Sequence, residues 1–184
     1  AITGNGADDA LFEIVGGNLQ FIAAPDYETD AQTYEVEVTA SDGVNDSAPQ
    51  TITITLTDVN DNAPVITTSA TQSVDENAAF SVALTSTDAD TAGTIPATFT
   101  ITGGADQALF SIDGSGNLTM TAKDYESPID SGADNNYEVE VTANDGANTT
   151  AQTITVTVTD VNDNAPVITT EAVQSVAENA AFSV

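Results

Sequence analysis

The residues best suited to chemistry are Asp and Asn side chains gathered in a short connector that occurs twice. Residues 58–64 read Asp-Val-Asn-Asp-Asn-Ala-Pro, and residues 160–166 repeat them letter for letter. Carboxylate, amide and carbonyl oxygens are hard ligands, and Ca²⁺ takes six to eight of them in flexible geometry. The proline restricts the residue before it to an extended backbone and favours the start of a new strand. Two identical connectors of this kind predict calcium sites between rigid elements.

Further acidic residues stand where the predicted strands end. They are Asp26-Tyr-Glu28 and its copy Asp124-Tyr-Glu126, Asp88-Ala-Asp90, and the single residues Asp42 and Asp145. The chain holds 29 Asp and Glu against one Lys or Arg, for a net charge of −28. At an effective dielectric of about 20, two carboxylates roughly 4 Å apart repel each other by about 4 kcal/mol. Acids that cluster at strand ends therefore need a cation, and divalent metal ions would supply it.

The composition excludes several function classes. The chain has no Cys and no His, so it has neither a thiolate metal site nor a Ser-His or Cys-His catalytic pair. A single cationic side chain argues against phosphate or nucleic-acid binding. No run of about 18 apolar residues is present, so no membrane insertion is expected. Paired carboxylates can serve a glycosidase, but few aromatic residues are available to stack on a sugar, and we expect no enzyme.

Internal repetition predicts the domain organisation. The two connectors lie 102 residues apart, Tyr34–Ala40 recurs at Tyr137–Ala143, and Glu76–Val82 recurs at 178–184. A period of this length is typical of tandem domains. The predicted domains are a partial repeat at 1–64 that lacks its first strands, a complete repeat at 65–166, and the opening strands of a third repeat at 167–184.

The complete repeat contains short runs typical of β-strands. These runs are rich in β-branched and aromatic residues, and in one of them Tyr137, Val139 and Val141 alternate with polar residues. Segments rich in Gly, Asn and Asp separate the runs as turns. The expected strands are Val65–Val74, Ala78–Ser86, Ala97–Thr102, Leu109–Ile112, Leu118–Ala122, Tyr137–Ala143 and Thr153–Thr159. This spacing predicts an all-β fold, a tandem of immunoglobulin-like Greek-key β-sandwich modules.

The combined motifs resemble cadherin repeats. The resemblance rests on Asp-x-Asn-Asp-Asn-Ala-Pro, Glu76-Asn77, Asp88-x-Asp90, Asp124-x-Glu126 and Thr-Ala-Asn-Asp-Gly at 142–146. It implies three Ca²⁺ ions at each junction between repeats. For the first junction it implies an outer ion held by Asp26, Glu28 and Asp61, a middle ion held by Glu28, Asp58, the Val59 carbonyl, Asp61 and Asp90, and a third ion held by Asn60, the Asn62 carbonyl, Asp88, Asp90 and Asp145.

The same resemblance implies a second junction in the copy. Its ligands would be Glu76, Asp124, Glu126, Asp160, Asn162, Asp163 and the carbonyls of Val161 and Asn164. Asp42 would serve a junction upstream and Glu178 one downstream. The glutamate that opens the first repeat is expected before residue 1, and the far-side acids of the second junction after residue 184. The chain also departs from the family. Tyr27 and Tyr125 take the place of the Arg in the family's usual Asp-Arg-Glu, while the flanking acids are kept.

The resemblance implies a calcium-binding structural spacer of an extracellular adhesin, stiffened by Ca²⁺ at the linkers and supporting adhesion. The abundance of Thr, Ala, Asn and Asp with one Lys is most similar to bacterial cadherin-like repeats of large surface adhesins. The expected partners are neighbouring repeats of the chain or copies of itself, and another cell-surface protein or glycan.

Two alternative functions stay open at this point. One is a subunit of a self-assembling extracellular fibre, in which residues 167–184 donate strands to the first repeat of another copy. The other is a carbohydrate- or protein-binding module of a secreted protein, which would need an exposed aromatic platform.

Overall fold

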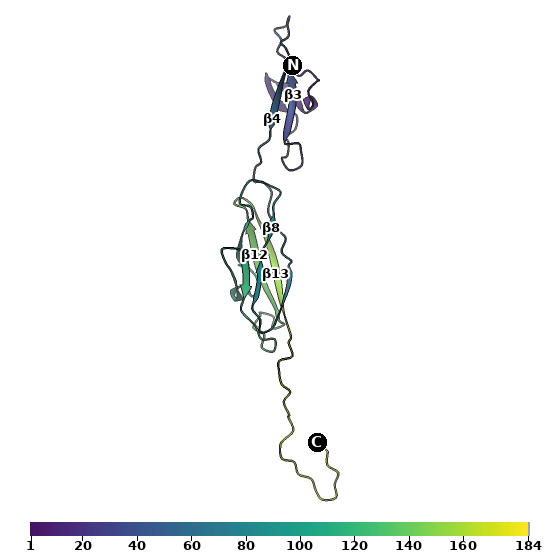
Figure 1. Cartoon of the computed structure of the whole chain (residues 1–184), viewed down its shortest axis with the longest axis vertical. Coiled ribbons are helices and arrows are strands. Elements are labelled where there is room, and N and C mark those ends of the chain that lie inside the picture. The colour runs from purple at the N-terminus through teal and green to yellow at the C-terminus, as the bar shows by residue number, and fades with distance from the viewer. Residues whose placement is uncertain (184) are drawn as a thin grey trace.

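The computed structural model describes residues 1–183 as two folded repeats joined end to end and followed by an extended tail (Figure 1). We call residues 58–64 the first linker, 160–166 the second linker and 167–183 the tail. The tail leaves the end of the middle repeat that lies farthest from the first repeat. Among the described residues, no helix is long and apolar enough to cross a membrane.

The first repeat consists of two antiparallel hairpins. Its elements are η1 (Asp9–Leu11), β1 (Phe12–Val15), β2 (Asn18–Phe21), β3 (Thr33–Val38) and β4 (Gln50–Thr55). β1 pairs with β2 and β3 pairs with β4. Gly16 and Gly17 connect β1 to β2 with φ of +59° and +89°, which is the left-handed backbone that a tight two-residue hairpin turn requires.

The middle repeat is a β-sandwich, as the sequence predicts. Its elements are β5 (Val65–Ile66), β6 (Thr71–Asp75), β7 (Phe80–Ala83), β8 (Ser86–Thr87), β9 (Thr98–Gly103), η2 (Gln107–Leu109), β10 (Phe110–Ile112), β11 (Asn117–Met120), β12 (Asn136–Asn144) and β13 (Thr149–Thr159). One sheet has the order β6-β13-β12-β9 and the other β10-β11-β7, while β5 pairs with β8. β6 runs parallel to β13 along its outer edge.

The core of the middle repeat follows the predicted alternation. Tyr137, Val139 and Val141 of β12 are fully buried, as are Ile154 and Val156 of β13. Successive side chains of a strand point to opposite faces, so one face of each strand fills the space between the sheets. Burial of these side chains holds the sandwich together and fixes the loops at its two ends.

Several predicted strand bounds were wrong. The expected strand Val65–Val74 is divided into β5 and β6, and Ala78–Ser86 into β7 and β8. The reason is a change of partner, because β5 pairs with β8 whereas β6 pairs with β13.

The tail forms no strand within 167–183, although opening strands of a third repeat were expected there. It repeats residues 65–81, whose strands are stabilised by pairing with β8, β11 and β13. The 184 residues contain no counterparts of those three partners for the tail. An extended strand without a partner leaves its backbone groups to water and gains no packing. The domain prediction for 167–184 stays a prediction, and residue 184 lies outside the described residues.

Candidate metal centre

The first linker docks on the loop that follows β8. Asp58 Oδ2 accepts hydrogen bonds from the Thr91 hydroxyl, the Thr91 N–H and, at 2.9 Å, the Ala92 N–H. The Asn62 N–H donates to Asp90 Oδ2 at 2.8 Å, and Asn62 Nδ2 donates to Asp90 Oδ1 at 2.7 Å. These bonds hold the linker and the loop together, so their acidic side chains share one small volume.

The turn between β12 and β13 closes the other side of the linker. Asp145 Oδ1 accepts hydrogen bonds from the N–H groups of Ala147 and Asn148, both at 2.7 Å. Asn148 Nδ2 in turn donates to the Asn62 carbonyl at 2.9 Å and to Asn60 Oδ1 at 3.1 Å. The turn therefore fixes where the linker's amide and carbonyl oxygens lie.

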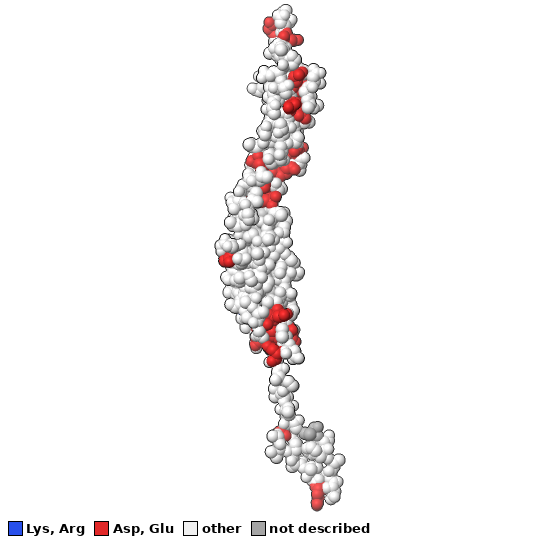
Figure 2. All heavy atoms as spheres, viewed as in Figure 1, with Lys and Arg blue, Asp and Glu red and all other residues white. Residues whose placement is uncertain are grey.

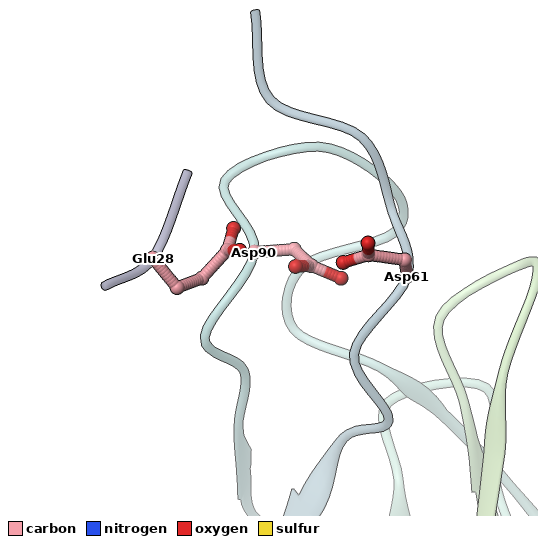
Figure 3. A group of neighbouring side chains, drawn as sticks. All are labelled: Glu28, Asp61 and Asp90. Carbon is pink, nitrogen blue, oxygen red and sulfur yellow. The ribbon is translucent and has the colours of Figure 1, made fainter. Parts of the chain in front are cut away.

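Three carboxylates from three parts of the chain meet at this junction. Glu28 comes from the first repeat, Asp61 from the first linker and Asp90 from the loop of the middle repeat. Their oxygens lie within 4.8 Å of one another. Figure 3 shows the three side chains in one row, with Asp90 between Glu28 and Asp61. A divalent cation at such a place would tie the two repeats to each other.

Four carboxylate oxygens at the first junction are buried and accept no hydrogen bond from the described part of the chain. They are Glu28 Oε1, Asp58 Oδ1, Asp88 Oδ2 and Asp145 Oδ2. All four belong to residues that the sequence analysis predicts as calcium ligands. A buried anionic oxygen without a partner is costly, because it has lost its water and gained nothing in exchange. The donor set consists of hard oxygens, so these residues fit Ca²⁺.

The pKa values of Glu28 and Asp58 at the first junction are shifted in opposite directions. Burial, followed by the neighbouring carboxyls of Asp26 and Asp58, raises the pKa of Glu28 to about 7. The Thr91 hydroxyl and the backbone N–H groups of Thr91 and Ala92 lower the pKa of Asp58.

Cations are scarce around these acids. Lys123 is the only Lys or Arg of the sequence, and it donates to Thr121 Oγ1 at 2.8 Å. Figure 2 shows the acidic residues gathered in bands at the ends of the repeats with no blue atoms beside them. Neither junction is neutralised by the protein's own side chains.

At the second junction, the side that belongs to the middle repeat is held by hydrogen bonds to Glu76. Glu76 is 4% exposed, and its carboxylate accepts hydrogen bonds from the Tyr125 N–H at 2.9 Å and the Val161 N–H at 2.8 Å. Its oxygens lie within 4.8 Å of those of Asp124 and Glu126. Burial, followed by the neighbouring Asp124 and Glu76 carboxyls, raises the pKa of Glu126. Glu76 therefore anchors the second linker and belongs to an acidic cluster.

The remaining second-junction residues are open to solvent. Asp163 accepts a hydrogen bond from Asn77 Nδ2 at 2.7 Å, which ties the linker back to the middle repeat. Asp160, Asn162 and Asn164 are exposed. The structure thus brings Glu28, Asp61 and Asp90 of the first junction within 4.8 Å of one another. It also ties Asp58, Asn60 and Asn62 of the first linker to the middle repeat by hydrogen bonds. At the second junction it brings together Glu76, Asp124 and Glu126, all of the middle repeat.

Sequence reasoning missed two residues of the site, Thr91 and Asn148. Both act as hydrogen-bond donors that position the linker, and neither is an acid, so a search for carboxylates passes over them. A signal for Asn148 does exist: Asp-Gly-x-Asn occurs at 42–45 and again at 145–148. In both copies the Asp Oδ1 accepts the N–H of the Asn three residues later, at 2.8 Å for Asn45 and 2.7 Å for Asn148.

Comparison with known proteins identifies the fold of the chain. No protein-family model and no curated protein sequence matches the chain. Among solved structures, human protocadherin-24 EC1-2 is similar over 85% of this chain and 80% of its own, at 22% identity and a TM-score of 0.66. The protocadherin gammaB7 EC3-6 cis-dimer structure is similar over 89% of this chain and 42% of its own, at 24% identity and a TM-score of 0.70. The fold is that of cadherin extracellular repeats.

A third solved structure, human CDH23 EC21-23, has the same arrangement. It covers 87% of this chain and 54% of its own, at 20% identity and a TM-score of 0.65. Because each match extends over more than four fifths of this chain, it takes in both folded repeats. The predicted cadherin-like sandwich is therefore confirmed as a fold. The calcium ligands remain predictions that rest on the geometry given above.

Proposed function

We propose that this chain is a calcium-binding structural spacer of an extracellular adhesin. The observation that carries the proposal is the set of four buried, unpartnered carboxylate oxygens at the first junction, on Glu28, Asp58, Asp88 and Asp145. They come from the first repeat, the first linker and the middle repeat, so an ion bound by them would connect bodies that otherwise share only a short peptide. Ca²⁺ would supply the positive charge that these carboxylates lack.

Three Ca²⁺ ions would nearly neutralise the first junction. Seven carboxylates belong to the first junction, namely Asp26, Glu28, Asp58, Asp61, Asp88, Asp90 and Asp145. Three Ca²⁺ ions would bring six positive charges, which nearly neutralises the group. Without the ions the carboxylates repel one another, and the joint between the repeats becomes a hinge. With them the two repeats become one rod.

The adhesive setting is supported by the fold and by the composition. The solved structures with this fold include the extracellular cadherin domains of protocadherin gamma B7. The composition, with one Lys and no Arg, carries the resemblance to bacterial cadherin-like repeats of surface adhesins. The spacer would work outside the cell, where a site of 10⁻⁴ to 10⁻³ M affinity is filled. Its partners would be neighbouring repeats, copies of the chain, and a surface protein or glycan.

A glycan-binding or protein-binding module receives less support. It would need an aromatic platform on the surface, whereas Phe12, Tyr34, Phe80, Phe110 and Tyr137 are buried in the two cores. The exposed aromatic side chains Tyr125 and Phe182 belong to different parts of the chain, the middle repeat and the tail. We therefore propose a structural role and no catalytic one.

Calorimetric titration of Ca²⁺ into chelator-treated chain tests the proposal. We expect heat of binding, a thermal melting temperature that rises with Ca²⁺, and loss of both at the first junction in the Asp90→Asn variant. Binding to the folded state alone raises stability with ligand concentration. The absence of heat together with an unchanged melting temperature would contradict the calcium function.

A further inference from the structure

The side-chain amide of Asn148 is surrounded by oxygens of the first linker. Its Nδ2 lies 2.9 Å from the Asn62 carbonyl oxygen, 3.1 Å from Asn60 Oδ1 and 3.3 Å from the Asn60 carbonyl oxygen. A primary amide has two N–H groups, so these three acceptors share two hydrogens. Three oxygens therefore converge on one atom that can satisfy them only in part.

The turn that precedes β13 holds Asn148 in this place. Asp145 Oδ1 accepts the Asn148 N–H at 2.7 Å, and the Asp145 N–H donates to the Asn148 carbonyl at 3.3 Å. The same two bonds join Asp42 and Asn45 in the first repeat, at 2.8 Å and 3.2 Å. Because Asn45 is exposed, the turn itself, rather than contact with a linker, presents the Asn side chain.

Asn60 is oriented with its side-chain oxygen toward Asn148. Asn60 Nδ2 donates to the Asp145 carbonyl at 3.4 Å, and it lies so near Gly93 that a Cβ there would be 2.2 Å away. This arrangement leaves Oδ1 for the Asn148 amide. Asn60 Oδ1 and the Asn62 carbonyl are both among the ligands predicted for the third Ca²⁺ ion. Asn148 thus contacts two predicted ligands of the same ion.

The spacing of these oxygens is that of neighbouring ligands around one ion. Ca²⁺ holds six to eight oxygens at about 2.3–2.6 Å, so neighbouring oxygens of its shell lie roughly 3 Å apart. Asn148 Nδ2 lies 2.9 Å and 3.1 Å from the two predicted ligands. Five residues are predicted to hold the third ion, which leaves room for a further ligand. The end of the Asn148 side chain occupies such a position, but with a nitrogen, which donates and cannot bind a cation.

Unbalanced negative charge lies beside Asn148. Asp145 Oδ2 and Asp88 Oδ2 are buried and accept no hydrogen bond from the residues that the structure describes. Both residues are predicted ligands of the third ion, and Asp145 is 1% exposed. A buried anionic oxygen without a partner is costly, so this position favours a cation and a further oxygen over an N–H donor.

We propose that Asn148 is a further Ca²⁺ ligand of the first junction and that its amide turns over when the ion binds. The inference rests on the proposed calcium function. Without Ca²⁺, Nδ2 holds the oxygens of Asn60 and Asn62 in place. With Ca²⁺, a half-turn about the Cβ–Cγ bond exchanges Nδ2 for Oδ1, which then joins these oxygens around the ion.

The half-turn requires little rearrangement of the junction. The two ends of an amide have nearly the same size, so the backbone of the turn can stay where it is. Asn148 Oδ1 accepts no hydrogen bond from the described part of the chain, so no bond to this oxygen is broken. The linker oxygens are already held about one ligand spacing apart, and such preorganisation reduces the cost of binding.

NMR of the side-chain amides in the full chain tests the turnover directly. The Asn148 NH₂ signals are identified by their loss in the Asn148→Asp variant. In chelator these hydrogens should exchange slowly with water, because they are bonded to the linker. At saturating Ca²⁺ they should exchange about fivefold faster or more, since at least one net hydrogen bond is lost. Unchanged exchange in the Ca²⁺-bound chain would show that Asn148 stays a donor, and would overturn the proposal.

Calorimetric titration of two variants tests the ligand role. A carboxylate has the shape of the amide but offers only oxygens, so Asn148→Asp should bind Ca²⁺ about tenfold more tightly, because ligand charge sets the affinity of calcium sites. The same variant should melt at a lower temperature in chelator, where the amide's bonds to the linker are lost. Asn148→Ala should bind about tenfold more weakly. Equal weakening in both variants would show that Asn148 acts only as a donor.

Thr149→Asp is the matched control for added charge. Thr149 is exposed and adjacent to Asn148, so this variant brings the same charge to the junction without placing an oxygen among the linker's. Its Ca²⁺ affinity should stay within about twofold of the unmodified chain, as expected of a screened surface charge. If it gains as much affinity as Asn148→Asp, charge alone explains the effect and the ligand role is refuted.

The titration of the unmodified chain separates this inference from the calcium function on which it rests. A chain that binds no Ca²⁺ contradicts both. A chain that binds Ca²⁺ while the Asn148 amide keeps its slow exchange contradicts the turnover alone, and leaves the calcium function intact.

Discussion

The two linkers have the same seven residues but different surroundings. In the first linker Pro64 is fully buried, and Asp58, Asn60 and Asn62 are half-buried between two repeats. In the second linker every residue from Asp160 to Pro166 is exposed. The difference shows that the sequence of the linker supplies the oxygens, whereas the folded neighbours on either side arrange them.

Each junction shows a different side of one arrangement in most detail, and at the first junction Glu28 of the first repeat also joins the acidic cluster. The first junction has the far side, where the loop after β8 and the β12–β13 turn hold the linker. The second junction has the near side, where Glu76 anchors the linker through two backbone N–H groups. Together they describe how a complete junction between two repeats is built, and the variants below separate the two halves.

The largest effect is expected from Glu76→Ala. The change leaves the N–H groups of Tyr125 and Val161 without their buried charged acceptor, which should lower the free energy of unfolding of the middle repeat by about 3 kcal/mol. Urea denaturation in chelator measures this apart from metal binding. Glu178→Ala is the control, because Glu178 is exposed and its loss should leave the unfolding midpoint in place. Equal losses in both variants would contradict the anchoring role.

The next largest effect is on Ca²⁺ affinity, when the same Asp is changed in each of the two linkers. Asp61→Asn removes a carboxylate from the cluster with Glu28 and Asp90, and should weaken Ca²⁺ binding at the first junction by more than about tenfold, beyond what loss of an outer-shell partner costs. Asp163→Asn, at the matching position, should leave binding at the first junction unchanged. Calorimetric titration of the two variants in parallel measures the difference. If they bind alike, the first junction is not the stronger site.

A smaller effect should follow from filling the space between the loop and the first linker. Gly93 has φ of +94°, and a Cβ there would lie 2.2 Å from Asn60 Nδ2. Gly93→Ala should push the linker away from the loop and weaken Ca²⁺ binding about fivefold, the equivalent of roughly 1 kcal/mol of overpacking.

Gly16→Ala is the matched control for Gly93→Ala. Gly16 also has positive φ, but a Cβ there meets nothing within 4 Å. An alanine there also carries a backbone penalty, since φ is +59°, so it should destabilise the first repeat without changing Ca²⁺ affinity. A loss of affinity in both variants would show that backbone strain, rather than contact with the linker, is responsible.

The smallest effect is the pH dependence of the first junction. The pKa of Glu28 is raised from 4.5 to about 7, so the folded, metal-free chain binds this proton more tightly than the unfolded chain. Its stability should therefore fall as the pH rises from about 4.5 to about 7. Because Ca²⁺ must displace the proton, affinity should be about threefold lower half a unit below pH 7 than half a unit above it. Calcium titrations at both pH values check this, and Glu28→Gln should remove the difference.

Much of the fold could be predicted because the strands alternate. Tyr137, Val139 and Val141 occupy every second position of β12, and this period leaves one arrangement in which they are buried together. The bounds of β5 to β8 could not be predicted in the same way. Those strands are divided where they change partners, and the choice of partner depends on residues far away in the sequence.

The candidate site was predicted as a set of acids but not as a structure. Repetition of the linker identified its oxygens, and the acids at strand ends identified the carboxylates that surround it. The roles of Thr91 and Asn148 are invisible in that pattern, because neutral donors of this kind are common in turns. The contrast between the two linkers was also hidden, since their sequences are the same.

The stiffness of the first junction tests the central claim most directly. The chain has no Cys, so Thr51→Cys and Thr153→Cys, both at exposed positions, place one spin label on each repeat. Pulsed dipolar spectroscopy then measures the distribution of distances across the first linker. We predict a narrow distribution with Ca²⁺ and a broad one in chelator, with the Asp61→Asn variant broad in both. Distributions of equal width with and without Ca²⁺ would contradict the account.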